Sequence, residues 1–268
     1  MTARIIGRTV FGDDVSEAEA AQSVRGFAKY QSRVEQMSLA DCCGLPTLKH
    51  LTNPYKTWRT HRAAGEVHQI IDRIIERRAR SGISQPHSLL DLFLQNDPSG
   101  GRCPMSKNAV RNEAIVMFMA GHETTANTLA WAWYLLDGKP EARNRLQQEI
   151  EEVLEGRLPT LDDVPQLVYT RAVIEETMRL YPPVPILSRQ ARRGDRVGNK
   201  EVEPGTIIVV MPWLLHRHKL YWEEPDAFVP ERFLPDQPRP DKCLYFPFSV
   251  GPRVCLGLRF GLTESILC

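Results

Sequence analysis

The 268-residue sequence lacks an excess of charge of either sign, and it lacks long apolar runs. It contains 34 Lys plus Arg against 33 Asp plus Glu. This balance argues against a general nucleic-acid binder, which carries a strong basic excess. No stretch reaches the ~20 apolar residues of a membrane span, and Arg4 and Arg8 interrupt the apolar segment that a signal peptide would need. We therefore expect a cytoplasmic protein with no transmembrane segment and no nucleic-acid partner.

Motifs for several kinds of cofactor are also missing. The six cysteines include no Cys-x-x-Cys pair and no zinc-type spacing with histidine, so most of them are expected to be free thiols. The sequence has no Gly-x-Gly-x-x-Gly motif and no four-cysteine cluster, so we expect neither a flavin site nor an iron–sulfur centre. With 42% hydrophobic and 25% charged residues, the composition is that of a globular protein and excludes a disordered chain.

The chain changes character near residue 181, where helical periodicity gives way to short strands and proline-rich loops. Of the 20 prolines, 12 lie between Pro182 and Pro252. We expect a fold that is mainly α with a small β region. The periodicity predicts helices over 2–12, 16–38, 57–80, 106–136, 140–155 and 167–180, and strands over 184–191, 196–202 (with a hairpin turn at 198–199) and 206–211.

A glycine-flanked cysteine lies on a tight loop that leads into a helix. The segment is Phe248-Ser-Val-Gly251-Pro-Arg253-Val-Cys255-Leu-Gly257, and a helical pattern follows it. Free backbone N–H groups at a helix start, together with the nearby Arg253, favour negative charge on the sulfur. Taken alone, Cys255 could be a nucleophile, a metal ligand or a buried thiol on a glycine turn.

A Glu-x-x-Arg pair lies near the end of the helix predicted over 167–180. Glu176 and Arg179 are three residues apart, so their side chains share one helix face. Taken alone, such a pair is most simply interpreted as a solvent-exposed ion pair of little energetic value. Further on, Arg232 occurs in a Pro-Glu-Arg-Phe segment. A buried glutamate between two arginines could accept bidentate hydrogen bonds from both of them.

An acid and an alcohol stand side by side in the middle of the apolar helix predicted over 106–136. The segment over 120–125 is Ala-Gly-His-Glu-Thr-Thr, in which Glu123 precedes Thr124. Such a pair can deliver protons, although a buried hydroxyl can also bond back to a carbonyl of the preceding helical turn. A zinc-protease helix is excluded, because Ala126 stands where that motif needs its second histidine.

Together the four motifs resemble those of the cytochrome P450 superfamily, and they occur in that family's order. The resemblance implies that Cys255 is the axial thiolate ligand of the iron of heme b, and that Arg253 pairs with a heme propionate. It further implies roles for Arg189 (second propionate partner), Phe248 (packing near the sulfur), Gly251 and Gly257 (loop glycines), Gly121 (room for dioxygen), Glu123 (proton relay), Thr124 (hydrogen bond to dioxygen), and Glu176, Arg179 and Arg232 (buried charge triad).

The implied reaction is monooxygenation, in which one atom of O2 enters a lipophilic small-molecule substrate. Ile115, Phe118 and Met119 are expected to line the pocket. Since no redox centre of the chain's own is expected, electrons would come from a separate ferredoxin or flavodoxin with its reductase. Two alternatives stay open. One is heme-thiolate chemistry on peroxides, against which the Glu123-Thr124 pair argues, and the other is a non-catalytic remnant with weak or no heme binding.

The chain is short for the family that it resembles. Its first residues are similar to a helix from the middle of the usual N-terminal half, and its last residues to the helix after the heme loop. We expect one partial P450-like domain over 1–268, with early helices and strands and the final strands missing. Residues 1–180 form its helical part, and residues 181–268 hold strands, a proline-rich meander and the heme-thiolate loop. Trp58 and Arg62 resemble a propionate-binding pair but occur too late in the chain, so no role is assigned to them.

Overall fold

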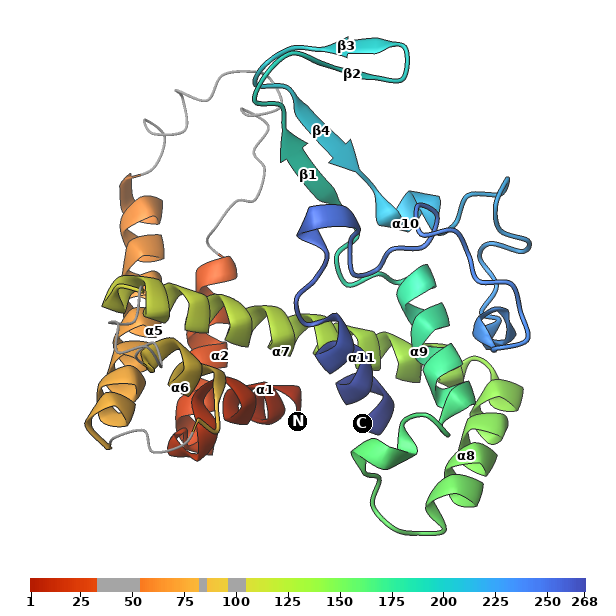
Figure 1. Ribbon diagram of the computed structural model, residues 1–268, viewed down its shortest axis with the longest axis horizontal. Helices are drawn as coiled ribbons and strands as arrows, with labels where there is room; N and C mark the ends of the chain where they lie inside the picture. The colour runs from red at the N-terminus through yellow and green to blue at the C-terminus, as the bar shows by residue number, and fades with distance from the viewer. Residues whose placement is uncertain (33–53, 82–85, 96–104) are drawn as a thin grey trace. The chain divides into compact units, whose positions relative to one another are not determined.

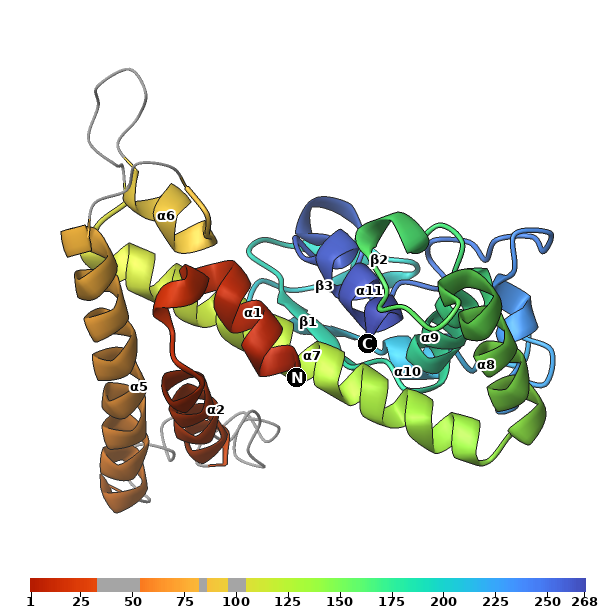
Figure 2. The same ribbon diagram turned by 90° about the horizontal axis from the view of Figure 1, so that it is seen from below.

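The computed structural model, drawn in Figures 1 and 2, describes residues 1–32, 54–81, 86–95 and 105–268. Helices dominate these residues, and the strands form two-stranded sheets. The predicted class, mainly α with a small β region, is therefore confirmed. The chain divides into two compact units, Met1–Glu123 and Thr124–Cys268. Among the described helices, none is long and apolar enough to cross a membrane.

Capping side chains start several helices of the first unit. The Ser16 hydroxyl accepts a hydrogen bond from the backbone N–H of Glu19, whose carboxylate accepts one from the Ser16 backbone N–H, as the sequence predicts. A second capping box, of Ser88 with Asp91, starts a six-residue helix that periodicity alone did not predict. The elements are α1 (Thr2–Phe11), η1 (Gly12–Asp14), α2 (Glu17–Gln31), α5 (Pro54–Ser81), α6 (Leu89–Leu94) and the first part of α7 (Lys107–Asp137).

Apart from α6, the α-helices of this unit agree with the predicted ones to within a few residues at their described ends. One part of the prediction, residues 33–38, lies outside the described residues. The apolar face predicted for α5 is the buried face. Val67, Ile70, Ile71, Ile74 and Ile75 are each at most 5% exposed. Helix amphipathicity therefore fixes which side of α5 enters the core.

Gly121 of α7 is a close-packing point in the first unit. A Cβ atom placed on it would lie 2.6 Å from Cδ1 and 2.8 Å from Cγ1 of Ile6, on α1. Ile6 is itself buried. On this face of α7 the Ile6 side chain therefore occupies the space that a side chain at position 121 would need, and the room for dioxygen at Gly121 stays a prediction.

We expect Gly121→Ala to lower the free energy of unfolding by about 1–3 kcal/mol, the usual cost of overpacking a core. Gly65→Ala on α5 is the matched control, because a Cβ at Gly65 meets nothing within 4 Å. That change should stabilise by about 0.5–1 kcal/mol, as alanine does over glycine in helices. Ile6→Val, which removes Cδ1, should recover part of the loss in the double variant. Urea unfolding gives the free energy of unfolding of the parent, the two glycine variants and the double variant. Equal values for Gly121→Ala and Gly65→Ala would contradict this packing.

The second unit contains the remaining helices. Helix α8 (Pro140–Leu154) begins with proline at its first position, directly after Lys139. Helix α9 (Val168–Leu180) ends where Tyr181 precedes two prolines. Both helices were predicted. The helical elements are the end of α7, α8 (Pro140–Leu154), η3 (Leu161–Asp163), α9 (Val168–Leu180), α10 (Pro212–Leu215), η4 (Pro230–Phe233), η5 (Gly251–Arg253) and α11 (Leu258–Leu267).

The predicted strands of the second unit form two antiparallel pairs and no larger sheet among the described residues. Gly198, with φ of +59°, makes the predicted hairpin turn of the second pair. In the first pair, Leu187 lies opposite Val210 and Gln190 opposite Ile207. The strands are β1 (Leu187–Gln190), β2 (Asp195–Val197), β3 (Lys200–Val202) and β4 (Ile207–Val210), paired β1 with β4 and β2 with β3.

Helix α9 is the centre of the second unit, as Figure 1 shows in green. Its residues from Ala172 to Leu180 are all buried. One side packs with α7 and α8 in a cluster that includes Leu136, Leu146 and Val173. Because α9 is buried all round from Ala172 onward, the polar side chains of this part must find partners inside the protein.

Candidate functional site

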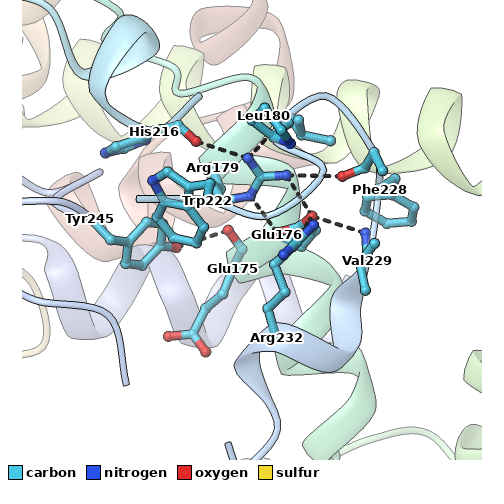
Figure 3. Close-up of polar contacts among 12 residues, drawn as sticks. Glu175, Glu176, Arg179, Leu180, His216, Trp222, Phe228, Val229, Arg232 and Tyr245 are labelled. Carbon is cyan, nitrogen blue, oxygen red and sulfur yellow. Dashed lines mark hydrogen bonds and ion pairs between the residues drawn. The ribbon is translucent and has the colours of Figure 1, made fainter. Parts of the chain in front are cut away.

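A buried ion pair anchors the second unit (Figure 3). Glu176 and Arg179 have no exposed side-chain surface. Arg179 Nε donates to Glu176 Oε2 at 2.7 Å, and Arg179 Nη2 donates to Oε1 at 2.8 Å. The interpretation of a solvent-exposed pair is therefore wrong. The bidentate geometry is the strong form of an arginine–carboxylate contact.

Arg179 also holds a long loop against α9. Its Nη1 donates to the carbonyls of His216 at 2.8 Å and Pro225 at 2.7 Å, and its Nη2 donates to that of Ala227 at 2.9 Å. In return, the backbone N–H of Val229 donates to Glu176 Oε1 at 2.9 Å. One guanidinium thus satisfies carbonyls spread over 12 residues of chain that have no regular structure of their own.

Arg232 joins this pair in a weaker way than the sequence suggested. Its Nε lies 3.6 Å from Glu176 Oε1 and makes no hydrogen bond, while its Nη2 donates to the carbonyl of Glu224 at 3.1 Å. The charge triad is therefore formed, but the expected bidentate bonds from both arginines are not. The reason is that Glu176 Oε1 already accepts from Arg179 and from Val229.

Aromatic rings enclose the triad on one side. The Arg179 guanidinium lies over the ring of Trp222, 5.0 Å from its centroid. His216 is fully buried, and its Nε2 accepts a hydrogen bond from the backbone N–H of Phe246 at 3.2 Å. Burial lowers the pKa of His216 to about 4. The imidazole is therefore neutral and adds no positive charge beside Arg179.

The cysteine loop is a tight turn that ends at α11. The Cys255 backbone N–H donates to the carbonyl of Phe248 at 2.8 Å, which closes the loop. Gly251 has a positive φ of +72°, as a glycine at a turn can. Ser249 also has a positive φ, of +63°, which is uncommon for a residue with a side chain and which the sequence did not signal. The Cys255 thiol is free and exposed, so the interpretation of a buried thiol is wrong.

The other residues of the predicted cofactor site lie on this loop itself, except Arg189, which lies on β1. Gly257 precedes α11, and a Cβ on it would lie 3.9 Å from the Cys255 sulfur. Phe248 packs into an apolar cluster with Ile174 of α9 and Ala132 of α7. Arg253 is exposed at the end of η5. Arg189 lies on β1, where its guanidinium donates to the carbonyl of Ser188 at 2.8 Å.

The acid–alcohol motif lies where expected, on α7. Glu123 and Thr124 are consecutive and half-buried. The Thr124 carbonyl accepts a hydrogen bond from the hydroxyl of Thr128, one turn later, at 3.0 Å. The next residue, Thr125, is buried, and its hydroxyl is 3.9 Å from where a Cβ of Gly261 would be.

Three residues near this motif had no predicted role, namely Thr125, Gly261 and Glu264. A Cβ on Gly261 would also lie 3.9 Å from the Phe248 ring, so α11 meets both the cysteine loop and the Thr125 turn at this glycine. Glu264 is a buried carboxylate one turn later. The sequence could have pointed to two of them, because Gly261 and Glu264 stand three residues apart in a helix whose other residues are mostly apolar.

The donor set around Cys255 fits a heme. Among the described residues, no three His, Cys, Asp or Glu side chains cluster in a way that could hold a metal ion. A single thiolate can hold a metal whose other ligands come with it, as the four nitrogens of a porphyrin do. The exposed thiol of Cys255 and the exposed guanidinium of Arg253 supply the ligand and a cation for a propionate.

Comparison with known proteins yields a consistent set of relatives. A family model described as cytochrome P450 matches residues 1–268. Cyclooctatin synthase of Streptomyces melanosporofaciens is 32% identical over 275 residues, covering 100% of this chain and 58% of the relative. Cyclooctat-9-en-7-ol 5-monooxygenase of the same organism is 33% identical over 265 residues, covering 98% and 57%. The crystal structure of the cytochrome P450DA heme domain matches with a TM-score of 0.81 and 25% identity, covering 99% of this chain and 57% of that one.

The chain therefore belongs to the cytochrome P450 family, as its motifs predicted. Its fold is the P450 fold, in an incomplete form. The chain spans 57% to 58% of the length of these relatives, which agrees with the expectation of a partial fold.

Proposed function

We propose that the chain carries the heme-binding and oxygen-activating residues of a heme-thiolate monooxygenase. Cys255 would bind the iron of heme b, and Arg253 and Arg189 would pair with its propionates. When bound, the heme supplies the activation of O2 with two electrons from a separate ferredoxin or flavodoxin and its reductase. The observation that carries the proposal is the free, exposed thiol of Cys255. It stands at the end of a loop that the hydrogen bond from the Cys255 backbone N–H to the Phe248 carbonyl closes.

The chain's own residues would control charge, water and protons around that group. Phe248, packed against α7 and α9, would keep water from one side of the thiolate. The Thr124 hydroxyl would donate a hydrogen bond toward the reacting oxygen, and the Glu123 carboxyl group would return protons from solvent. The Glu176–Arg179 pair would act at a distance by fixing the loop over 216–229.

A lipophilic small molecule is the proposed substrate. Phe118 and Met119 of α7 are buried in the first unit, while Ile115 on the same helix is half-buried. A relative whose name describes a monooxygenase of cyclooctat-9-en-7-ol supports an apolar substrate of that general size.

Thiolate ligation is tested by two serine variants. Cys255→Ser should abolish the strongly red-shifted Soret band of the reduced, CO-bound, heme-loaded protein, because a serine oxygen does not replace a thiolate. Cys243→Ser is the matched control, since Cys243 is also a free, exposed thiol. It should leave the band unchanged. Loss of the band in the Cys243 variant, or its survival in the Cys255 variant, would overturn the assignment.

A further inference from the structure

His216 is a fully buried histidine that connects the charge triad to the cysteine loop. It follows α10 directly, and its ring packs against those of Tyr245 and Phe246, with centroids 5.3 and 5.4 Å away. Its backbone carbonyl accepts the hydrogen bond from Arg179 Nη1 at 2.8 Å (Figure 3). A buried imidazole is shut off from water, so the partners of its two ring nitrogens decide which of them holds the proton.

The two ring nitrogens of His216 have different surroundings. Nε2 accepts a hydrogen bond from the backbone N–H of Phe246 at 3.2 Å. A nitrogen that accepts carries no proton, so the neutral ring holds its proton on Nδ1. Nδ1 makes no hydrogen bond of good geometry among the described residues, but the carbonyls of Met178 and Arg179 act on the ring as acceptors. Carbonyls in the last turn of a helix lack helical partners, which makes them available to an N–H group.

Phe246 is the first residue of a series of backbone hydrogen bonds that ends at the predicted iron ligand. The Phe246 carbonyl accepts from the backbone N–H of Ser249 at 3.0 Å. The Phe248 carbonyl accepts from the backbone N–H of Cys255 at 2.8 Å. The bond from Phe246 to His216 therefore holds the start of the same loop whose end carries the Cys255 thiol.

The charges around His216 keep its ring neutral. Burial lowers the pKa of His216 to about 4 from an ordinary value of 6.5, and the positive charge of Arg179 on α9 acts in the same direction. Glu176 pairs with that charge at 2.7 Å. Tyr245, which packs on the ring, stays neutral as well, because burial raises its pKa well above 10. Protonation of the ring would place a donor opposite the Phe246 N–H, and the hydrogen bond between them would be lost.

We propose that His216 is a positioning residue for Cys255, whose unprotonated Nε2 fixes the Phe246 backbone and thereby the loop that presents the thiol. The role in catalysis rests on the proposed function, because the place of the thiol matters for the reaction only if Cys255 binds the heme iron. His216 is bonded to Arg179 through its carbonyl and to Phe246 through its ring. The buried charge triad is thus connected to the cysteine loop through one side chain.

The position of the ring proton is tested by ¹⁵N NMR of the full parent chain without heme. The His216 signals are identified by their nuclear Overhauser contacts with the Tyr245 ring, which packs on it. At neutral pH, His216 should show a protonated Nδ1 and an unprotonated Nε2. A proton on Nε2 would overturn the proposal, because that nitrogen could not accept from Phe246.

The pH dependence of unfolding tests whether the neutral ring stabilises the fold. Because the folded-state pKa of His216 lies below the unfolded value, its contribution is complete above about 6.5 and is lost as pH falls towards about 4. The folding equilibrium constant of the parent should fall on the order of 100-fold across this range relative to that of His216→Gln, which keeps an acceptor and cannot ionise. An equally steep loss in both proteins would overturn the proposal.

Tyr245→Phe is the matched control for this measurement. It removes the hydrogen bond that the Tyr245 hydroxyl donates to the Glu175 carbonyl at 2.9 Å, one residue before Phe246. The control should therefore lower stability and keep the pH dependence of the parent. If it removed the pH dependence as His216→Gln does, the effect would belong to the packing of this segment and the proposal would be wrong.

Amide hydrogen exchange tests the effect on the loop itself. His216→Leu should speed exchange at Phe246, Ser249 and Cys255 on the order of tenfold, and more than in α8, because the loop loses the bond at its start. His216→Gln should restore most of the protection, since its side-chain oxygen can accept in place of Nε2. Equal exchange in the leucine variant and the parent would refute the positioning role.

The heme-loaded protein shows whether the same contact places the thiol. His216→Leu should convert part of the strongly red-shifted Soret band of the reduced, CO-bound protein into an unshifted band, and His216→Gln should keep the parent band. Identical bands in the parent and the leucine variant would overturn the role. A parent without the red-shifted band would overturn the proposed function and the catalytic part of this role, whereas the heme-free measurements decide the contact of His216 with Phe246 by themselves.

Discussion

Arg179→Leu is expected to lower the free energy of unfolding by about 3–5 kcal/mol, the cost of leaving a buried charge without its partner. The variant would strand Glu176, which has no exposed side-chain surface, and would remove the donors of three loop carbonyls. Because the whole stability of a domain is typically about 5–15 kcal/mol, a loss of this size would remove a large share of it.

Arg171→Leu is the matched control for this prediction. Arg171 lies on the same helix, and its Nε is 3.6 Å from Glu175 Oε2, but its side chain is 46% exposed. Glu175 is 10% exposed and keeps its hydrogen bond from Arg239 at 2.9 Å, so removing the half-exposed Arg171 should cost about 0–1 kcal/mol. Glu176→Gln combined with Arg179→Leu should cost less than the sum of the two single changes, since no charge is then left buried. Urea unfolding would contradict the account if Arg179→Leu cost no more than Arg171→Leu.

Thr124→Ala is expected to uncouple electron consumption from product formation in protein that turns over with heme. The reason is that a positioned proton donor is typically worth ~10²–10⁴ in rate. The product formed per NAD(P)H should fall steeply while hydrogen peroxide rises, and heme binding and reduction should persist. A purely structural threonine at this position would cost some stability and leave the ratio unchanged.

Thr128→Ala separates these two interpretations. Thr128 lies one turn after Thr124, is buried, and bonds back to the Thr124 carbonyl at 3.0 Å. Its loss should destabilise the protein by about 0.5–1.5 kcal/mol, the net contribution of one hydrogen bond, without changing the ratio, because the Thr124 carbonyl keeps its backbone bond within α7. If both variants gave the parent ratio of product to NAD(P)H, Thr124 would have no place in proton delivery.

The sequence predicted the elements that local interactions determine. The periodicity of α5, the capping box at Ser16 and the prolines after Tyr181 are local signals, and the helix ends agree with them. Local patterns also predicted that Cys255 lies just before a helix and that the Glu123-Thr124 pair lies within one.

The details that the sequence did not predict depend on residues far apart in the chain. The contact of Gly121 with Ile6 joins α7 to α1 and has no local signal. The weak attachment of Arg232 depends on Val229 having already taken an acceptor site of Glu176. The buried state of Glu264 depends on α11 packing, and helical periodicity alone did not distinguish it from an exposed carboxylate.

The absorption spectrum of the unaltered chain, loaded with heme, reduced and exposed to CO, tests the central claim most directly. If Cys255 supplies a thiolate to the iron, the Soret band should be strongly red-shifted. A chain that is a non-catalytic remnant would take up little heme and show no such band. An unshifted Soret band in heme-loaded protein, or no heme uptake at all, would contradict the account.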